Sequence, residues 1–147
     1  MTQTDDLASG RLSVRLRLCL AAAATCLLAP LTTAACLRPN PAGLGTHQQL
    51  GLPPCTFVYL FETRCPSCGM TTSWSHAVRG HWLQACGTNA GGAALAAIAL
   101  LAAPWLGVSA VCGRWWIGAP SDWGLACGAL CVVAVTLIDW IYRLYSG

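Results

Sequence analysis

The sequence predicts an all-α integral membrane protein with three transmembrane helices. Charged residues make up only 9% of the 147 residues and hydrophobic residues 56%, whereas a soluble globular domain carries roughly 25% charged residues. Three apolar runs are each about 20 residues long, which is enough for a helix to cross the hydrocarbon core of a bilayer. Because so little charge cannot solvate the surface of a small domain, we expect lipid to cover much of the molecule.

The first apolar run, residues 18–37, follows a polar N-terminal tail at residues 1–17. The run is uncharged and contains Pro30, which a membrane helix tolerates. Its basic start and the sequence "TTAAC" ending at Cys36 also resemble a processing site, so a cleaved signal segment is the alternative. Both interpretations place the residues after Cys36 outside the cytoplasm.

The second and third predicted transmembrane helices are residues 90–112 and 123–142. In the third, Asp139 has Arg143 four residues later, and we expect the two to form an ion pair at the membrane interface. Gly124 and Gly128 form a G-x-x-x-G pair that allows close helix packing. We expect packing within the chain, with a membrane-protein partner as the alternative.

The distribution of arginines bears on orientation. Arg11, Arg15 and Arg17 precede the first apolar run and favour a cytoplasmic N-terminus. Counted over the predicted topology, however, four of the eight arginines lie inside and four outside, so the arginines as a whole show no bias. We expect a multi-pass membrane protein that contacts the lipid bilayer. No basic run is dense enough to indicate nucleic-acid binding.

The segment between the first two spans, residues 38–89, carries the sequence "CPSC" at Cys65–Cys68. The preceding apolar stretch "LPPCTFVYLF" is too short to cross a membrane, so we expect it to lie at the interface. A short interfacial helix is predicted to start near Thr71. Side chains of residues 71–73, all Thr or Ser, are the predicted N-terminal cap.

The pattern from Leu52 to Asn89 resembles the bacterial membrane proteins of the family "domain of unknown function 2752". The shared features are a Pro-Pro-Cys start, an aromatic stretch, Cys-Pro-x-Cys-Gly-x-Thr, an Arg-Gly turn and an Asn before a transmembrane helix. The resemblance assigns the following residues to the family pattern: Cys55, Cys65, Pro66, Cys68, Gly69, Thr71, Arg79, Gly80 and Asn89. Many members have Arg where Thr72 stands and Asp where His81 stands. The resemblance implies this architecture and a multi-pass protein of a bacterial inner membrane, and it implies no activity.

One interpretation of the cysteines is a metal site, with zinc as the expected ion. A structural zinc site needs four Cys or His ligands, and a Cys-x-x-Cys turn supplies two of them. Cys55 is the predicted third ligand, because the family pattern includes it. The candidates for the fourth are Cys86 or His76, with His47 and His81 as weaker alternatives.

Two further interpretations remain open. Cys65 and Cys68 could act as a membrane thiol–disulfide redox pair, with Cys65 as the attacking thiol at a helix N-terminus. Alternatively, a disulfide between Cys55 and Cys86, or between Cys65 and Cys68, could close the segment. The sequence leaves enzymatic activity uncertain. It favours an interaction or scaffold role for a structural or metal-binding cysteine cluster.

The metal interpretation makes a geometric prediction. Pro66 fixes its own φ angle, and Gly69 relieves crowding where the chain enters the helix. We therefore expect Cys65 and Cys68 to face each other across a tight turn, with Cys55 within reach. Tetrahedral bonds near 2.3 Å predict sulfur-to-sulfur distances under about 4 Å.

Overall fold

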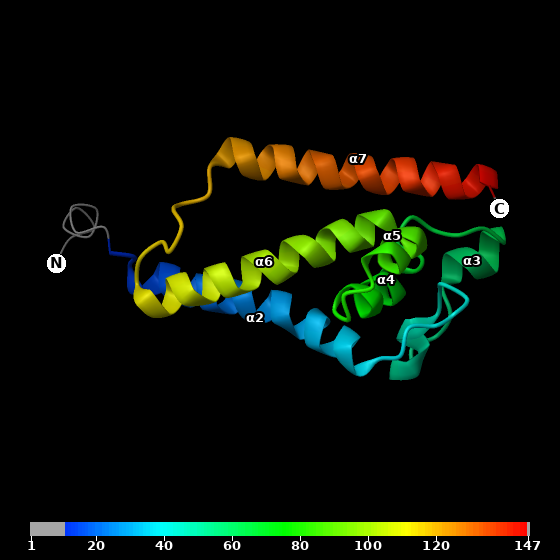
Figure 1. The fold of residues 1–147 in the computed structure, drawn as a ribbon, viewed down its shortest axis with the longest axis horizontal. Helices are drawn as coiled ribbons and strands as arrows, with labels where there is room; N and C mark the ends of the chain where they lie inside the picture. The colour runs from blue at the N-terminus through cyan, green and yellow to red at the C-terminus, as the bar shows by residue number, and fades with distance from the viewer. Residues whose placement is uncertain (1–10, 147) are drawn as a thin grey trace.

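The structure is a computed structural model that describes residues 11–146. It is all-helical, and the described residues contain no strand. Three long helices, α2 (Val14–Cys36), α6 (Ala90–Cys112) and α7 (Asp122–Ser146), run nearly parallel to one long axis (Figure 1). Residues 1–10 of the predicted polar tail lie outside the described residues, and its last four residues already belong to α2.

All three long helices are long and apolar enough to cross a membrane, with mean hydropathies of 1.8, 2.1 and 2.1 over their most apolar windows. In these stretches of α2, α6 and α7, only 22%, 28% and 0% of the residues, respectively, are buried inside the protein. Their outward side chains are therefore mostly apolar and exposed, as lipid contact requires. This arrangement confirms the predicted fold class, with the cysteines between the first two long helices.

Helices α2 and α6 form an antiparallel pair that packs through small side chains (Figure 1). The α6 face is lined by alanines and contributes Ala93, Ala96, Ala99 and Ala103 to the buried residues. Gly107 lies close enough to α2 that an added Cβ would meet the Cβ of Ala24 at 3.9 Å. Small residues bring two backbones together, which strengthens dispersion contacts between membrane helices.

An arginine binds the last carbonyls of each helix in this pair. Arg17, near the start of α2, donates from Nε to the Ala110 carbonyl at 2.8 Å and from Nη2 to the Val111 carbonyl at 3.1 Å. At the opposite end of the pair, Arg79 donates to the Ala35 carbonyl at 2.8 Å. Because the last carbonyls of a helix lack backbone partners and carry partial negative charge, both arginines stabilise the helix ends.

Helix α7 lies beside α6 and touches it most closely near Gly91. A Cβ added to Gly91 would lie 2.9 Å from the Cβ of Thr136, so only glycine fits at this crossing. The expected packing of Gly124 and Gly128 within the chain is wrong for the described residues. An added Cβ at Gly128 would meet nothing within 4 Å, and one at Gly124 would meet only Ser121.

Four short helices build the segment between α2 and α6. They are η1 (Thr46–Leu50), α3 (Thr56–Phe61), α4 (Met70–Ala77) and α5 (Trp82–Thr88). The last two pack against the start of α6 around a small core of Ala77, Ala85, Ala93 and Ala96, with Trp74 beside it. All four lie at the end of the molecule where α7 ends (Figure 1).

Candidate metal centre

The Cys65–Cys68 sequence forms a tight turn, as its spacing predicts. The Cys68 N–H donates to the Cys65 carbonyl at 3.0 Å, and the two Sγ atoms lie 2.9 Å apart. Helix α4 starts two residues later. The turn therefore presents both thiols on one side of the chain.

Cys55 completes a group of three thiols. It precedes α3, and its Sγ lies 3.7 Å from that of Cys65. The ligand atoms of Cys55, Cys65 and Cys68 all lie within 4.8 Å of one another, which suits a shared metal ion. The structure thus brings together the three cysteines named from the sequence, and two of the sulfur pairs, Cys55–Cys65 at 3.7 Å and Cys65–Cys68 at 2.9 Å, lie below the predicted limit. We call them the three-cysteine cluster.

The sequence-based candidates for a fourth ligand lie outside this group. Cys86 is exposed on α5, and His81 is exposed at the position before α5. His76 lies on α4, with its ring centroid 6.0 Å from that of His81. His47 comes nearer, because it lines the same cavity as the three-cysteine cluster, and its Nε2 lies 3.2 Å from the Pro53 carbonyl oxygen.

Gly69 permits the turn to enter α4. Its φ of 86° lies in the left-handed region, and a Cβ there would lie 2.7 Å from the Gly43 carbonyl oxygen and 3.1 Å from that of Thr88. Both observations confirm the predicted relief of crowding by glycine. The predicted cap is wrong, because Gly69 is the N-cap residue and no side chain caps the helix.

Two of the three residues expected to cap α4, Thr72 and Ser73, instead point into the protein. Thr72 is fully buried and shares a hydrogen bond of 2.7 Å with Thr46 of η1. Ser73, also fully buried, can donate to the carbonyls of Ala85 at 2.9 Å or Asn89 at 3.0 Å. The Thr72 side chain thus makes a neutral contact that holds η1 beside the cysteine turn.

Asn89 connects the cysteine turn to α6. Its side chain is fully buried, and Nδ2 donates to the carbonyls of Pro66 at 3.0 Å and Cys68 at 3.1 Å. Its Oδ1 accepts the Gly92 N–H at 2.6 Å and so caps α6. The three hydrogen bonds that the structure shows for this buried side-chain amide all join it to backbone groups. They hold the cysteine turn against the start of α6.

The last turns of α7 bind the same cysteine turn from the other side. Arg143 donates from Nη1 to the Cys68 carbonyl at 3.1 Å, and Trp140 donates from Nε1 to the Arg64 carbonyl at 2.7 Å. The expected pair is present, with Arg143 Nη2 2.7 Å from Asp139 Oδ2. That carboxylate also accepts the Ala90 N–H at the start of α6, at 3.3 Å.

Arg79 has a structural role. Besides the Ala35 carbonyl, its guanidinium binds the carbonyls of Leu37 at 2.7 Å and Ser75 at 2.6 Å. The buried Ser75 hydroxyl also donates to the Leu37 carbonyl at 2.7 Å. This network fixes α4 to the end of α2 and so positions the cysteine turn relative to the long helices.

The thiols differ in their ease of ionisation. Burial raises the pKa of Cys68 to about 12, and its hydrogen bond with Cys65 adds to the rise. Nearby backbone N–H groups, that of Val58 above all, lower the pKa of Cys55, although burial acts in the opposite direction. A bound cation would deprotonate thiols that coordinate it, Cys68 included.

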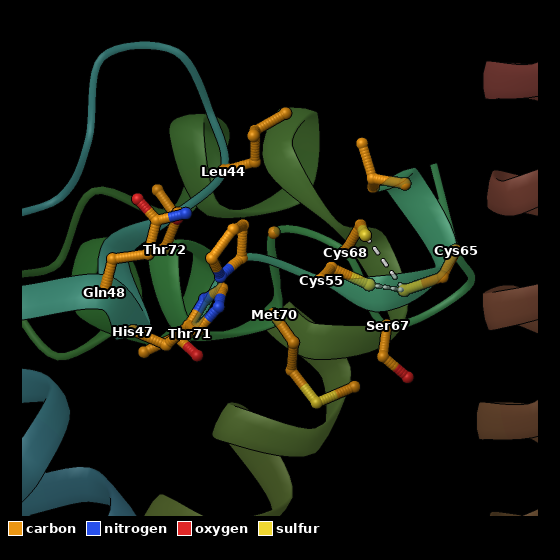
Figure 2. Close-up of a pocket in the computed structure, with 14 residues that line it drawn as sticks. Leu44, His47, Gln48, Cys55, Cys65, Ser67, Cys68, Met70, Thr71 and Thr72 are labelled. Carbon is orange, nitrogen blue, oxygen red and sulfur yellow. Dashed lines mark hydrogen bonds between the residues drawn. The ribbon is translucent and has the colours of Figure 1, made fainter. Parts of the chain in front are cut away.

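A cavity of about 300 Å³ opens beside the cluster, and all three cysteines line it. Figure 2 shows the three sulfurs gathered at one end of this cavity, with His47 and Gln48 at the other. Most of the remaining wall comes from uncharged side chains, including Leu44, Pro54, Val58, Met70 and Thr71. The cluster is thus accessible from one side.

Residues 55–103 match the family described as "Protein of unknown function (DUF2752)". This match confirms the resemblance found in the sequence. The DUF2752 segment begins at Cys55 and contains the three-cysteine cluster, α3 to α5 and the first part of α6. Neither the curated proteins nor the solved structures gave a significant match.

Several residues that hold the DUF2752 segment were not named as site residues from the sequence. Thr46 and Trp140 give no pattern that marks them as neighbours of the cysteine turn. The sequence predicts that Arg143 pairs with Asp139, but no sequence pattern predicts its hydrogen bond to the Cys68 carbonyl.

Proposed function

We propose that this protein is a small bacterial inner-membrane protein whose three-cysteine cluster binds a metal ion, with zinc as the first candidate. The bound ion would hold the segment between α2 and α6 in a fixed shape that serves an interaction or scaffold role. The observation that carries the proposal is the convergence of three thiols from two separate stretches of chain to within 4.8 Å.

The surroundings support a metal-held segment. Asn89 holds two backbone carbonyls of the cysteine turn, and contacts behind the ligands that fix their position are a common feature of metal sites. The segment itself has little apolar core, so a cross-link by one ion would contribute strongly to its stability.

The metal content and free-thiol count of the detergent-purified full-length protein test this function. We expect about one zinc ion per chain, three thiols protected until a chelator is added, and a lower melting temperature after chelation. Variants Cys55→Ser, Cys65→Ser and Cys68→Ser should each lose the metal. Metal-free protein with unprotected cysteines at all three positions would contradict the proposal.

A second candidate function is thiol–disulfide exchange by Cys65 and Cys68, favoured by their sulfur-to-sulfur distance of 2.9 Å. The variant Cys55→Ser separates the two functions, because a two-thiol redox pair does not need Cys55. Equilibration with glutathione buffers, read by mass spectrometry, would show a reversible Cys65–Cys68 disulfide in that variant if the redox function holds.

We further propose that the N-terminus is cytoplasmic and that the cysteine segment lies on the outer face. Support comes from the three arginines at residues 11–17. Exposed Tyr59, Leu60 and Phe61 on α3 would rest at the outer lipid surface. A membrane-impermeant maleimide should label exposed Cys86 in spheroplasts with an intact inner membrane, and labelling only after lysis would reverse the topology.

We also propose that α2 stays attached in the mature protein, because it is bound at both ends to other segments. Arg17 of α2 caps α6, and Arg79 binds the end of α2. The intact mass of protein purified with a C-terminal tag should therefore include residues 18–36. A mass that begins at or near Cys36 would show cleavage.

The protein partner of a scaffold would pack on α7. Gly124 and Gly128 face no other helix of the described chain, which leaves a close-packing surface for a partner helix. In-membrane cross-linking from Cys127 should capture a second chain, and Gly128→Leu should reduce the product. Cross-linking that is unchanged by this substitution would argue against this surface.

A further inference from the structure

We infer that a metal ion in the three-cysteine cluster keeps one exchangeable coordination position, which opens into the adjoining cavity and accepts a small uncharged Lewis base. The inference rests on the proposed metal function and deepens it. It makes the centre a site that binds a ligand, rather than a closed four-ligand structural clip.

The number of protein ligands is the first support. Among residues 11–146, the group of candidate metal-binding side chains at this place contains Cys55, Cys65 and Cys68 and no fourth member. Zinc is bound by four protein ligands in structural sites, and by three with an open position in catalytic sites. The three-cysteine cluster supplies three protein ligands, the number found in sites with an open position.

The position of the cavity is the second support. The same three cysteines line a space of about 300 Å³, which lies at the lower end of the range for small-molecule sites. Cys86 and His76 are not part of its wall. His47 lies at the far end from the sulfurs (Figure 2), with its Nε2 beside the Pro53 carbonyl.

The charge of the site selects the class of ligand. A divalent ion with three thiolates carries one net negative charge. Within the described chain, no Asp, Glu, Lys or Arg lines the cavity, and His47 lies at the end away from the sulfurs, so an anionic ligand on the metal would add a second negative charge with no cation beside it. A charge without a partner is unfavourable in a cavity with a mostly uncharged wall. A neutral donor, such as water or an uncharged nitrogen base, avoids that penalty.

The test uses cobalt(II) as a spectroscopic substitute for zinc in the detergent-purified full-length chain. Six other cysteines are replaced by Ala to remove competing thiols: Cys19, Cys26, Cys36, Cys112, Cys127 and Cys131. Thiolate-to-cobalt charge-transfer bands report the three cysteines, and ligand-field bands report the fourth position. Imidazole is the neutral probe and azide the anionic one.

We expect imidazole to shift the ligand-field bands in a saturable way while azide at the same concentration leaves them unchanged. Cys86→Ser, His76→Gln and His47→Gln should each keep the spectrum of the parent. A changed spectrum in any of these three variants, or no response to imidazole, would mean that the protein closes the site, and the inference would be wrong while the metal function stands. Tighter binding of azide than of imidazole would overturn the ligand class.

If the protein does not bind a metal at this cluster, the cobalt spectra differ in another way. In that case the parent would show no thiolate-to-cobalt bands, or bands that persist in Cys55→Ser and Cys65→Ser. The two proposals can therefore be judged separately in one set of spectra.

Discussion

Arg143 in the last turns of α7 donates a hydrogen bond to the carbonyl of Cys68, at 3.1 Å. Residues 75 positions apart are thereby joined at the cysteine turn. In the described part of the chain, the hydrogen bonds between α7 and the segments beside it all involve Asp139, Trp140 or Arg143. Docking of the third long helix and the shape of the cysteine turn are therefore linked.

Replacing Trp140 by Phe should weaken metal binding without unfolding the protein. The substitution keeps an aromatic ring and removes the N–H that donates to the Arg64 carbonyl, next to Cys65. Loss of a second-layer contact commonly costs about 10- to 100-fold in metal affinity. Competition with a chromogenic chelator measures the change. Trp123→Phe, at an exposed position of the same helix, is the control and should bind like the parent.

Asn89→Asp should be one of the most damaging single-atom changes in the segment. Asp keeps an oxygen to cap α6 but cannot donate to the carbonyls of Pro66 and Cys68, and places a carboxylate against them. A buried polar group that loses its partner costs about 1–3 kcal/mol, and more when charged. Thermal melting in detergent measures the loss. Asn40→Asp is the control, because it keeps the side-chain oxygen that accepts the Ala42 N–H. If the melting temperature of this control fell as far as that of Asn89→Asp, the explanation would be refuted.

Gly69→Ala should destabilise the protein by more than about 2 kcal/mol, because the left-handed backbone alone costs an alanine about 1–2 kcal/mol. The new Cβ would also meet the Gly43 carbonyl at 2.7 Å. Gly51→Ala is a matched control, since Gly51 has a φ of 76° and an added Cβ would meet nothing within 4 Å. Melting temperatures that fall equally in both variants would show that steric crowding at Gly69 is unimportant.

The stability of the protein should fall as the pH drops, and His76 should account for part of the fall. Burial lowers the pKa of His76 in the folded state, and repulsion from His81 and Arg79 lowers it further. The unfolded chain therefore binds a proton at His76 more readily than the folded protein does. The stability that neutral His76 allows is fully present above its unfolded pKa of about 6.5 and is lost as the pH falls below that value. His76→Gln should flatten the melting temperature between pH 7.5 and pH 5. A pH profile identical to that of the parent would contradict the role of His76.

Arg79→Lys should lower the melting temperature although the charge is kept. A lysine has a single ammonium group and cannot reach the carbonyls of Ala35, Leu37 and Ser75 together, as the planar guanidinium does. Each hydrogen bond from a charged donor contributes about 1.5–3 kcal/mol. Arg38→Lys is the control, because the hydrogen bonds that the structure shows at Arg38 come from its backbone. An Arg79→Lys variant as stable as this control would disprove the capping role.

The sequence predicts those parts of the fold that depend on composition and local spacing. Long apolar runs predict the three long helices, and the spacing of Cys65 and Cys68 predicts a tight turn between these two cysteines. Asp139 and Arg143 form their pair because they stand one helical turn apart. The approach of Cys55 is expected from the demands of a metal site and from the family pattern, and the sulfur positions agree with it.

Contacts between a side chain and a distant backbone carbonyl could not be predicted. Trp140 and Arg143 bind carbonyl groups, which every residue possesses, so no sequence pattern identifies their partners. The predicted N-terminal cap of α4 was wrong for a related reason. Thr72 and Ser73 have the chemistry of caps, but tertiary partners at Thr46 and Ala85 take up their hydroxyls and leave Gly69 to begin the helix.

The crowded surroundings of Gly69 have a consequence for anyone who wishes to transplant the cysteine motif. The backbone at Gly69 is packed against the Gly43 carbonyl, and Thr72 is held by Thr46. Both partners precede residue 55, where the family segment begins, and Arg143 follows its end. A minimal portable unit must therefore contain the loop before the segment and the end of the third helix, and a graft of residues 55–103 alone would carry the thiols without the geometry that gathers them.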